Sequence, residues 1–355
     1  MYARRVRSGL KGWGGVAAMA VVCALALAFV LLLPVARSAG DEPGTGGPGV
    51  ARGSQARAED GPCEKDPRIA KAPEAYTLSP SGADGDTIKK IKARTGEQRK
   101  LIVGVDQNSY RWGYRNPNSG QSGGTLEGFD IDLVHRIAES VLGDPDAVLF
   151  KAIPTNQRIP ALQEGRVDMV VRTMTINCDR LSQVAFSAPY FKTGQQVLAP
   201  KSSTIKGYDG TLAGKKICTA KGSTANSQLT EDQQAGKLAA SADLSTVVPN
   251  QLDCLVRLQL GEVDAVVTDG ALAASQAAQD PTVRLQGDPF TTEYYGVAMN
   301  LKADDLVRRV NQILADYRKD TADGWQASYD RWLSATLGTE SGTSEPPPPE
   351  YLRQS

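Results

Sequence analysis

A few polar residues in this chain have the types and positions needed to bind a small zwitterion. Thr173 and Asp269 end two predicted strands at equivalent points of an internal repeat, and Thr175 and Arg180 follow soon after Thr173. An arginine fork with donor hydroxyls suits a carboxylate, whereas the carboxylate of Asp269 suits an ammonium group. If two lobes bring these groups face to face, they match the two ends of an α-amino acid.

A loop of small residues adds a second feature of an anion site. Gly222, Ser223 and Thr224 lie between a predicted strand, residues 216–220, and a predicted helix. The first N–H groups of a helix have no partner within it, and such loops present them to anions. We therefore expect Ser223 and Thr224 to face the same ligand as Arg180.

The elements that position these residues form a repeat. Residues 161–173 match residues 257–269 at an offset of 96, with Leu, Gln, Gly, Val, Asp, Val and Val shared in one register. Each copy is a helix end, a Gly cap, a turn and a buried strand. Coincidence between two ordinary α/β turns is the alternative, and seven matches disfavour it.

Strands and helices alternate around both copies. Strands are predicted at residues 101–105 and 147–153, and the apolar spacing of residues 129–138 predicts a helix between them. This order indicates parallel sheets with right-handed crossovers. We predict an α/β protein of two lobes with related topology, whose ligand lies beyond the carboxyl ends of the parallel strands.

Composition excludes several classes of function. Forty Lys and Arg balance 40 Asp and Glu, so no bulk positive charge would hold a nucleic acid. The single His makes His-rich metal sites and His-based triads improbable. We expect neither a cofactor nor a metal, and no nucleic-acid partner.

The N-terminus predicts export. Basic residues in the first 11 positions precede an uninterrupted apolar run of 18 residues, 16–33. The run just reaches the length of a membrane-spanning helix, and the basic flank places the rest of the chain outside the cytoplasm. We favour residues 1–39 as a retained membrane anchor over a cleaved signal. Residues 40–62 are predicted to be a flexible linker, and the Pro-rich residues 339–355 a disordered tail.

Four cysteines remain outside the apolar run: Cys63, Cys178, Cys218 and Cys254. An even number in an oxidising compartment favours disulfides, and four cysteines allow three pairings. Free thiols are the disfavoured alternative. A zinc site is disfavoured further because the chain contains no C-x-x-C run.

At these residues the chain resembles the family-3 extracellular solute-binding proteins, the polar amino-acid receptors of ABC importers. The resemblance covers about residues 101–337. It rests on six runs in family order: GFDID at 128–132, IPALQEGRVD at 159–168, TMTINCDR at 173–180, FSAPY at 186–190, GST at 222–224 and VDAVVTD at 263–269. Each run alone is weak, and their order makes the signal strong.

The resemblance implies a role for each polar residue. Arg180 is expected to bind the ligand α-carboxylate, together with Thr175 and the backbone at Thr224. Asp269 is expected to bind the α-ammonium group, assisted by the carbonyl of Thr173. An aromatic ring usually covers the aliphatic part of the ligand, and both Tyr110 and Trp112 are candidates for that ring.

The resemblance also implies a discontinuous first lobe, residues 63–196 and 291–338, around a second lobe, 197–290. Two crossover strands near 195–199 and 290–296 would form the hinge. Cys178 departs from the usual family run, and we interpret it as the partner of Cys63. Cys218 and Cys254 both fall in lobe 2 and would then pair.

Arg158 is the expected specificity residue. It begins the helix after residues 153–157, at a point where members that bind acidic amino acids have an Arg facing the cleft. A solvated helix-start residue is nearly as good an interpretation. Arg172 lies beside Thr173, but strand alternation predicts that it points to the other face.

We therefore predict a receptor for glutamate or aspartate rather than glutamine, anchored to the membrane and delivering its ligand to ABC permease subunits. A membrane-anchored sensor that reports amino-acid level to a signalling partner is the alternative. An enzyme on the same scaffold is the weakest interpretation, because the inferred cleft has no surplus general acid or base.

Overall fold

The computed structural model describes residues 61–120, 123–339 and 342–354. No helix within these ranges is long and apolar enough to cross a membrane. The predicted anchor, residues 1–39, and nearly all of the predicted linker lie outside the described residues.

The first lobe is built on a five-stranded sheet. Its order is β5 (Val148–Ala152), β1 (Leu101–Val105), β6 (Met169–Val170), β15 (Ala298–Met299) and β7 (Ala185–Phe186). β1 runs parallel to β5 and β6, whereas β15 runs antiparallel to β6 and β7. The sheet is therefore mixed, with its three parallel strands grouped at one side.

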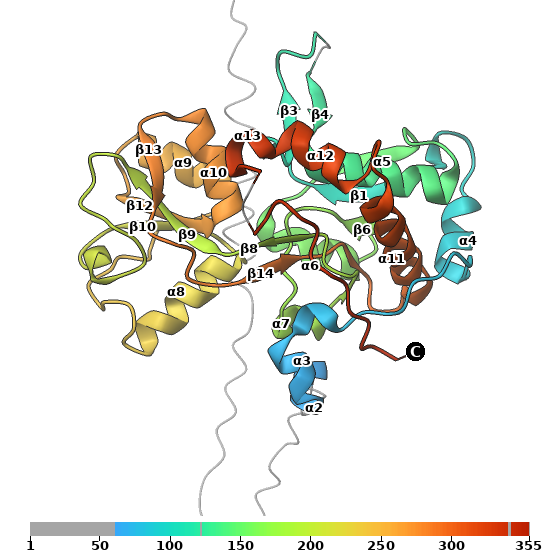
Figure 1. The fold of residues 1–355 in the computed structure, drawn as a ribbon, viewed down its shortest axis with the longest axis horizontal. Helices are drawn as coiled ribbons and strands as arrows, with labels where there is room; N and C mark the ends of the chain where they lie inside the picture. Colours follow the sequence, from blue (N-terminus) through green and yellow to red (C-terminus); the bar gives the residue numbers. More distant parts are fainter. Residues whose placement is uncertain (1–60, 121–122, 340–341, 355) are drawn as a thin grey trace, which may run out of the picture. The chain divides into compact units, whose positions relative to one another are not determined.

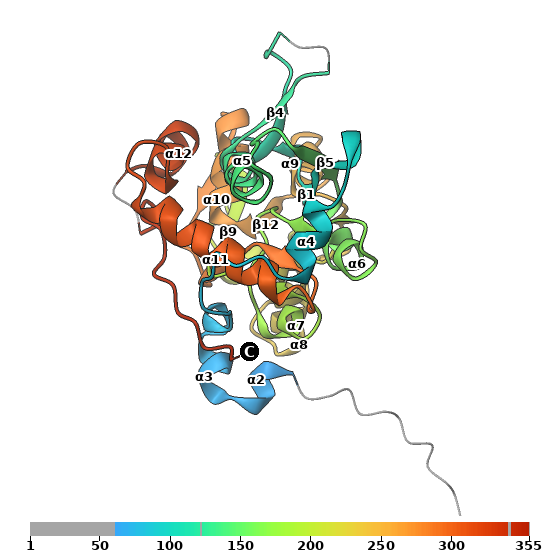
Figure 2. The same ribbon diagram turned by 90° about the vertical axis from the view of Figure 1, so that its right-hand side faces the viewer.

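Helices cover this sheet because each has one apolar face. α5 (Phe129–Leu142) buries Ile131, Val134 and Ile137, and ends at Gly143, whose φ of 78° suits a glycine cap. The other helices of this lobe are α4 (Asp86–Lys92), α6 (Arg158–Gln163), α7 (Cys178–Leu181), α11 (Asp304–Lys319), α12 (Trp325–Trp332) and α13 (Ser334–Leu337). Figure 2 shows α4 beside α11, and these two helices contact each other.

The second lobe repeats this arrangement. Its sheet has the order β11 (Val247–Val248), β10 (Ile217–Ala220), β12 (Ala265–Asp269), β9 (Gln195–Pro200) and β13 (Val283–Gln286). Its helices are α8 (Thr224–Gln234), α9 (Gln251–Gln259) and α10 (Gly270–Gln279). β6 and β12, the strands of the sequence repeat, are each the third strand of their sheet, so the repeat corresponds to equivalent positions in the two lobes.

Short elements complete the described chain. A small sheet consists of β2 (Asn108–Ser109), β3 (Gly113–Asn116) and β4 (Thr125–Glu127), and Figure 1 shows β3 and β4 projecting from lobe 1. Short helices precede β1, follow β5 or precede β10: α2 (Pro62–Lys65), α3 (Pro67–Lys71), η1 (Pro73–Ala75), η2 (Gly96–Gln98), η3 (Thr155–Gln157) and η4 (Gly210–Leu212).

Two antiparallel strands connect the lobes, β8 (Phe191–Thr193) and β14 (Glu293–Tyr295) (Figure 1). The second crossover lies within the predicted range. The first prediction, near residues 195–199, is wrong: β9 covers those residues and pairs on both sides with β12 and β13 of lobe 2. Gly194 separates β8 from β9, and a Cβ there would lie 2.0 Å from the carbonyl oxygen of Thr291. The chain thus changes lobe at a glycine that packs against the opposite crossover.

Both expected disulfides are present. Cys63 pairs with Cys178 and joins α2 to α7, and Cys218 pairs with Cys254 and joins β10 to α9. The first bridge fixes the N-terminal segment to lobe 1. The second fixes a helix of lobe 2 against its own sheet.

The Pro-rich tail was predicted to be disordered, but its last described residues contact the folded part of the chain. The backbone N–H groups of Leu352 and Arg353 donate to the carbonyls of Ala75 and Thr77, and Arg353 forms a 2.7 Å ion pair with Asp304. Prolines favour an extended chain, and here two N–H groups beyond the prolines find backbone acceptors in the N-terminal segment. Composition alone could not reveal this partner.

Candidate functional site

Arg180 lies where the two lobes meet, in the region expected to form the ligand cleft. It is on the short helix α7, whose first turn is capped by the Asn177 side chain, and it is 7% exposed. Nη1 donates to the carbonyl of Thr175 at 2.6 Å, and Nη2 donates to the carbonyl of Gly222 in lobe 2 at 3.2 Å. Burial lowers its pKa, while the charges of Glu293 and Asp269 raise it.

Arg158 approaches the same point from α6. It is 3% exposed, and its Nε and Nη2 donate to the carbonyls of Thr155, at 2.9 Å, and of Gly222, at 3.3 Å. Burial lowers its pKa well below the ordinary value, and the charges of Arg180 and Arg172 lower it further. None of the ion pairs among the described residues includes Arg158 or Arg180. The cleft therefore holds two buried guanidinium groups whose hydrogen-bond acceptors are mostly backbone carbonyls.

The glycine loop brings lobe 2 to these arginines. Gly222 has a φ of 77°, and a Cβ there would lie 3.0 Å from the Cα of Asn156 in lobe 1. Both observations require glycine at this contact. Ser223 caps α8, since its hydroxyl accepts from the N–H of Asn226 and donates to the carbonyl of Ala220. The Ser223 side chain is thus engaged within its loop, whereas Thr224 begins the helix.

Asp269 ends β12 and is 7% exposed. Its Oδ2 accepts a 2.5 Å hydrogen bond from the hydroxyl of Tyr295 on β14. Burial raises its pKa well above the ordinary value, and the charge of Glu293 raises it further. A cation in the cleft would favour its ionised form. The guanidinium of Arg180 and the carboxylate of Asp269 are thus both buried in one cleft and influence each other electrostatically.

Thr173 adopts an uncommon backbone conformation. Its φ is 41°, and its N–H donates to Asp130 Oδ2 at 3.1 Å. Asp130 also accepts from the hydroxyl of Tyr190, and burial raises its pKa to about 7. The carbonyl of Thr173, expected to face a ligand ammonium, lies 3.5 Å from Nη1 of Arg158. In this structure, that carbonyl therefore accepts from a positively charged side chain.

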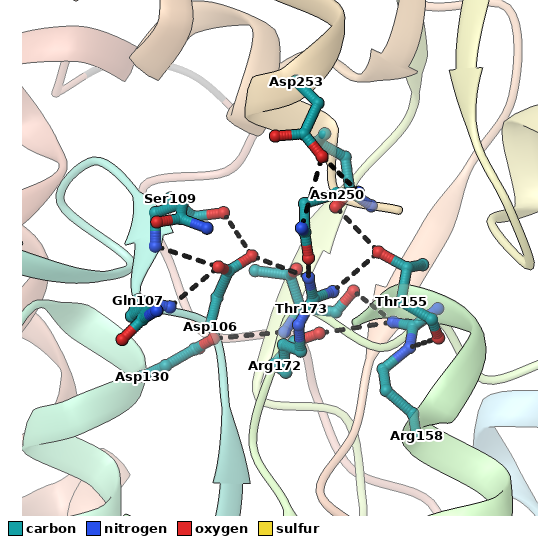
Figure 3. A network of polar contacts seen from close by, with 12 residues as sticks. Asp106, Gln107, Ser109, Asp130, Thr155, Arg158, Arg172, Thr173, Asn250 and Asp253 are labelled. Carbon is teal, nitrogen blue, oxygen red and sulfur yellow. Dashed lines mark hydrogen bonds and ion pairs between the residues drawn. The ribbon is translucent and has the colours of Figure 1, made fainter. Parts of the chain in front are cut away.

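The predicted direction of the Arg172 side chain is wrong. Strand alternation placed it on the opposite face, but β6 ends at Val170 and the turn at Thr173 redirects the chain. Its side chain is fully buried and forms a 2.9 Å ion pair with Asp106, a residue of lobe 1. It also reaches Oδ1 of Asn250 in lobe 2, at 3.1 Å. Figure 3 shows this network between the lobes.

Asn250 is itself positioned by a capping box. Its backbone N–H donates to Asp253, and its side chain accepts from the N–H of Asp253 at the start of α9. Beside it, the N–H of Thr155 donates to the carbonyl of Pro249, and the Thr155 hydroxyl donates to Gln251. A set of direct hydrogen bonds therefore joins the edges of the two lobes.

Glu293 is a further candidate residue of the cleft, and its role was not predicted from the sequence. It lies on β14, is 5% exposed, and accepts hydrogen bonds from the hydroxyls of Thr175 and Thr224, the latter at 2.9 Å. Gln195 donates to its other oxygen at 2.5 Å. The crossover strand was predicted, and strand alternation would have placed Glu293 on the same face as Tyr295. This alternation is the sequence signal that could have identified Glu293 as a residue of the cleft.

The two candidate aromatic residues lie in different environments. Trp112 is fully buried, and its ring packs edge-to-face against Phe129, Phe191 and Tyr295. Tyr110 is partly buried and lines a small pocket with Leu272 of lobe 2. Trp112 therefore belongs to the core of lobe 1, whereas Tyr110 faces the other lobe.

A cavity of about 590 Å³ opens beside the site. Thr175, Thr224, Gln195 and Glu293 line it together with the exposed side chain of Glu231. The cleft thus has a polar opening next to the Glu293 carboxylate.

The fold and this cleft define a class of protein. Residues 101–335 match the family model of the bacterial extracellular solute-binding proteins, family 3. Because the match spans most of the chain, the chain belongs to this family. It is an extracytoplasmic solute-binding protein and not an enzyme.

Several known proteins are similar to this chain. It is 33% identical over 257 residues to the ABC transporter glutamine-binding protein GlnH of Bacillus subtilis (strain 168), covering 71% of this chain and 89% of that protein. The glutamate-binding protein GluB of Corynebacterium efficiens is 27% identical over 259 residues, covering 69% and 81%. A solved ancestral arginine-binding protein bound to glutamine is 34% identical, with a TM-score of 0.56, covering 67% of this chain and 98% of that one.

Proposed function

We propose that the protein binds an acidic amino acid, glutamate or aspartate, in the cleft between its lobes and presents it to the permease of an ABC importer. The observation that carries this proposal is the pair of buried guanidinium groups, Arg158 and Arg180, which share the Gly222 carbonyl and lie outside every ion pair of the described residues. Buried charges are costly unless an opposite charge accompanies them. A ligand with two carboxylates supplies one for each arginine.

Each end of the ligand then has a partner. Arg180 binds the α-carboxylate together with Thr175 and the first backbone N–H of α8, at Thr224. Asp269 binds the α-ammonium group, and Arg158 binds the side-chain carboxylate. Ser223 positions the loop as a helix cap, and Tyr110 is the better candidate for the covering ring because it faces lobe 2.

Glutamine is the second candidate ligand. Two acids, Asp269 and Glu293, lie in the cleft with the two arginines, so its charges balance before a ligand enters. A neutral amino acid preserves that balance, and the similar GlnH protein is named as a glutamine-binding protein. Arg158 decides between the two ligands, because an amide gains much less than a carboxylate from a guanidinium partner.

Two kinds of membrane partner are compatible with this receptor, the permease of an importer and a signalling protein. The N-terminal apolar run, residues 16–33, supports an anchored receptor, and such a receptor serves either an importer or a signalling partner. The importer role is favoured by the similarity to ABC transporter proteins. Uptake of labelled glutamate by cells that lack this protein tests it: uptake should fall, whereas unchanged uptake would favour the sensor.

A further inference from the structure

We propose that Glu293 is a specificity-determining residue: it occupies the ligand's carboxylate site as an internal carboxylate, and because its displacement leaves a net positive charge in the cleft, a ligand with a net charge of −1 replaces it best. This inference rests on the proposed function, because it concerns the same site. It assigns a role to a side chain for which a binding role was not expected from the sequence.

The contacts of Glu293 show which chemical group the site accepts. The hydroxyls of Thr175, from lobe 1, and Thr224, from lobe 2, both donate to the same carboxylate oxygen. Thr175 is a residue that the proposed function assigns to the ligand α-carboxylate. The Glu293 carboxylate therefore holds at least one hydrogen bond that the ligand needs.

Electrostatics leads to the same conclusion. Among the charged groups that influence Arg180, Glu293 has the largest effect, ahead of Asp269. With Glu293 in place, Arg180 is influenced by two acids, Glu293 and Asp269, and Arg158 is influenced by Asp269. Arg172 is neutralised by Asp106. A ligand carboxylate entering this site without displacing Glu293 would place two anions around the same hydroxyl, which is unfavourable at short range.

The structure also provides room for the exchange. Glu293 lines the polar cavity of about 590 Å³ beside the cleft, where its carboxylate could become hydrated. Once Glu293 has moved there, Arg158 and Arg180 face only Asp269, and the cleft carries one net positive charge. A ligand with a net charge of −1 restores neutrality, so the displacement favours an acidic amino acid.

The test uses Glu293→Gln in the full-length protein. This change keeps the size of the side chain and an acceptor oxygen, but removes the charge that competes for Arg180. Calorimetric titration with L-glutamate should give a Kd about tenfold lower than that of the wild type, as expected when a charged hydrogen-bonded competitor is lost. Glu231→Gln is the matched control, because Glu231 lines the same cavity with an exposed side chain, and its Kd should equal that of the wild type.

The other outcomes are equally decisive. An unchanged or higher Kd in Glu293→Gln would overturn the inference, and a higher Kd would indicate that Glu293 binds the ligand ammonium. If Glu293→Gln does not fold, Thr224→Val replaces it as the test, because this change removes one donor to Glu293 but keeps the backbone N–H at the start of α8. The Kd for glutamate should also fall in Thr224→Val. An unchanged or raised Kd would refute the competition between Glu293 and the ligand. A wild-type protein that binds no amino acid would instead reject the proposed function, together with this inference.

Discussion

Nη2 of Arg180 lies 3.2 Å from the carbonyl oxygen of Gly222, so a guanidinium of lobe 1 contacts the glycine loop of lobe 2. The proposed function makes this guanidinium the partner of the ligand α-carboxylate. Arg180→Ala should weaken glutamate binding by at least about a hundredfold, because it leaves a ligand carboxylate buried without a partner. Arg180→Lys should restore only part of the affinity, since an ammonium keeps the charge and loses the fork.

Calorimetry measures this effect, and Arg166→Ala provides the control. Arg166 is exposed and pairs with Glu164 outside the cleft. Its variant should bind as the wild type does. Equal affinities for Arg180→Ala and Arg166→Ala would remove Arg180 from the binding site.

Arg158 should control the choice between an acid and its amide. Arg158→Ala should weaken glutamate binding by about 10- to 100-fold, the value of a hydrogen bond to a charged group, and change glutamine binding much less. The measured quantity is the ratio of the two Kd values. An unchanged ratio would show that Arg158 serves only the carbonyls of Thr155 and Gly222.

The buried pair of Arg172 and Asp106 should matter for stability. Arg172→Met leaves the carboxylate of Asp106 buried with its remaining donors, which include Ser109. Removing one partner of a buried pair typically costs about 3–5 kcal/mol. Urea unfolding should show a loss of this size.

Removing both charges tests the same argument. The double variant Arg172→Met with Asp106→Asn should recover part of the loss, because no uncompensated charge remains. A double variant less stable than the sum of the two single changes would contradict this explanation. The interlobe contact from Arg172 to Asn250 would then be the dominant contribution.

Asp130 should make stability depend on pH. Burial raises its pKa from 3.8 to about 7, so the folded state retains a proton that the unfolded state has released between these values. The free energy of unfolding should therefore fall as pH rises from about 4 to 7, by at most about 1.4 kcal/mol per pH unit from this group.

Asp130→Asn should flatten this dependence, because the amide cannot ionise. Urea unfolding at pH 4, 5, 6 and 7 measures the slope. Glu139→Gln, which changes an exposed residue of the same helix, is the control and should keep the wild-type slope. Parallel curves for wild type and Asp130→Asn would exclude Asp130 as the source.

The sequence predicted where in the fold three of the candidate site residues lie, at strand ends and helix starts. Asp269 ends β12, Arg180 lies in α7 and Thr224 begins α8. These positions follow from local pattern, because the hydrophobic strand and the small-residue loop fix where each side chain emerges. The two-lobed fold was predictable for the same reason, since the repeat marks equivalent strands.

Arg172 was misplaced and Glu293 was missed, because the positions of both side chains depend on features that a local sequence pattern does not specify. The direction of Arg172 depends on the early end of β6 and on a positive φ at Thr173, and a threonine gives little signal of that conformation. Glu293 is separated by more than a hundred residues from Thr175. Its role depends on how the crossover strands bring the two lobes together, and the exact end of the first crossover was itself misplaced.

The tail shows the limit of reasoning from composition. Four consecutive prolines predict an extended chain, and the structure assigns neither helix nor strand to residues 346–354. Whether an extended chain is free or docked depends on a partner, here residues 75–77 of the N-terminal segment. A pattern within the tail cannot identify that partner.

The most direct test of the account is a calorimetric titration of the wild-type protein with each of the twenty amino acids. We expect glutamate or aspartate to bind most tightly, with one site per chain, because the two buried arginines of the cleft, Arg158 and Arg180, form no ion pair among the described residues and each can bind one ligand carboxylate. Absence of binding to any amino acid, or binding only to cationic or apolar ones, would contradict the central claim.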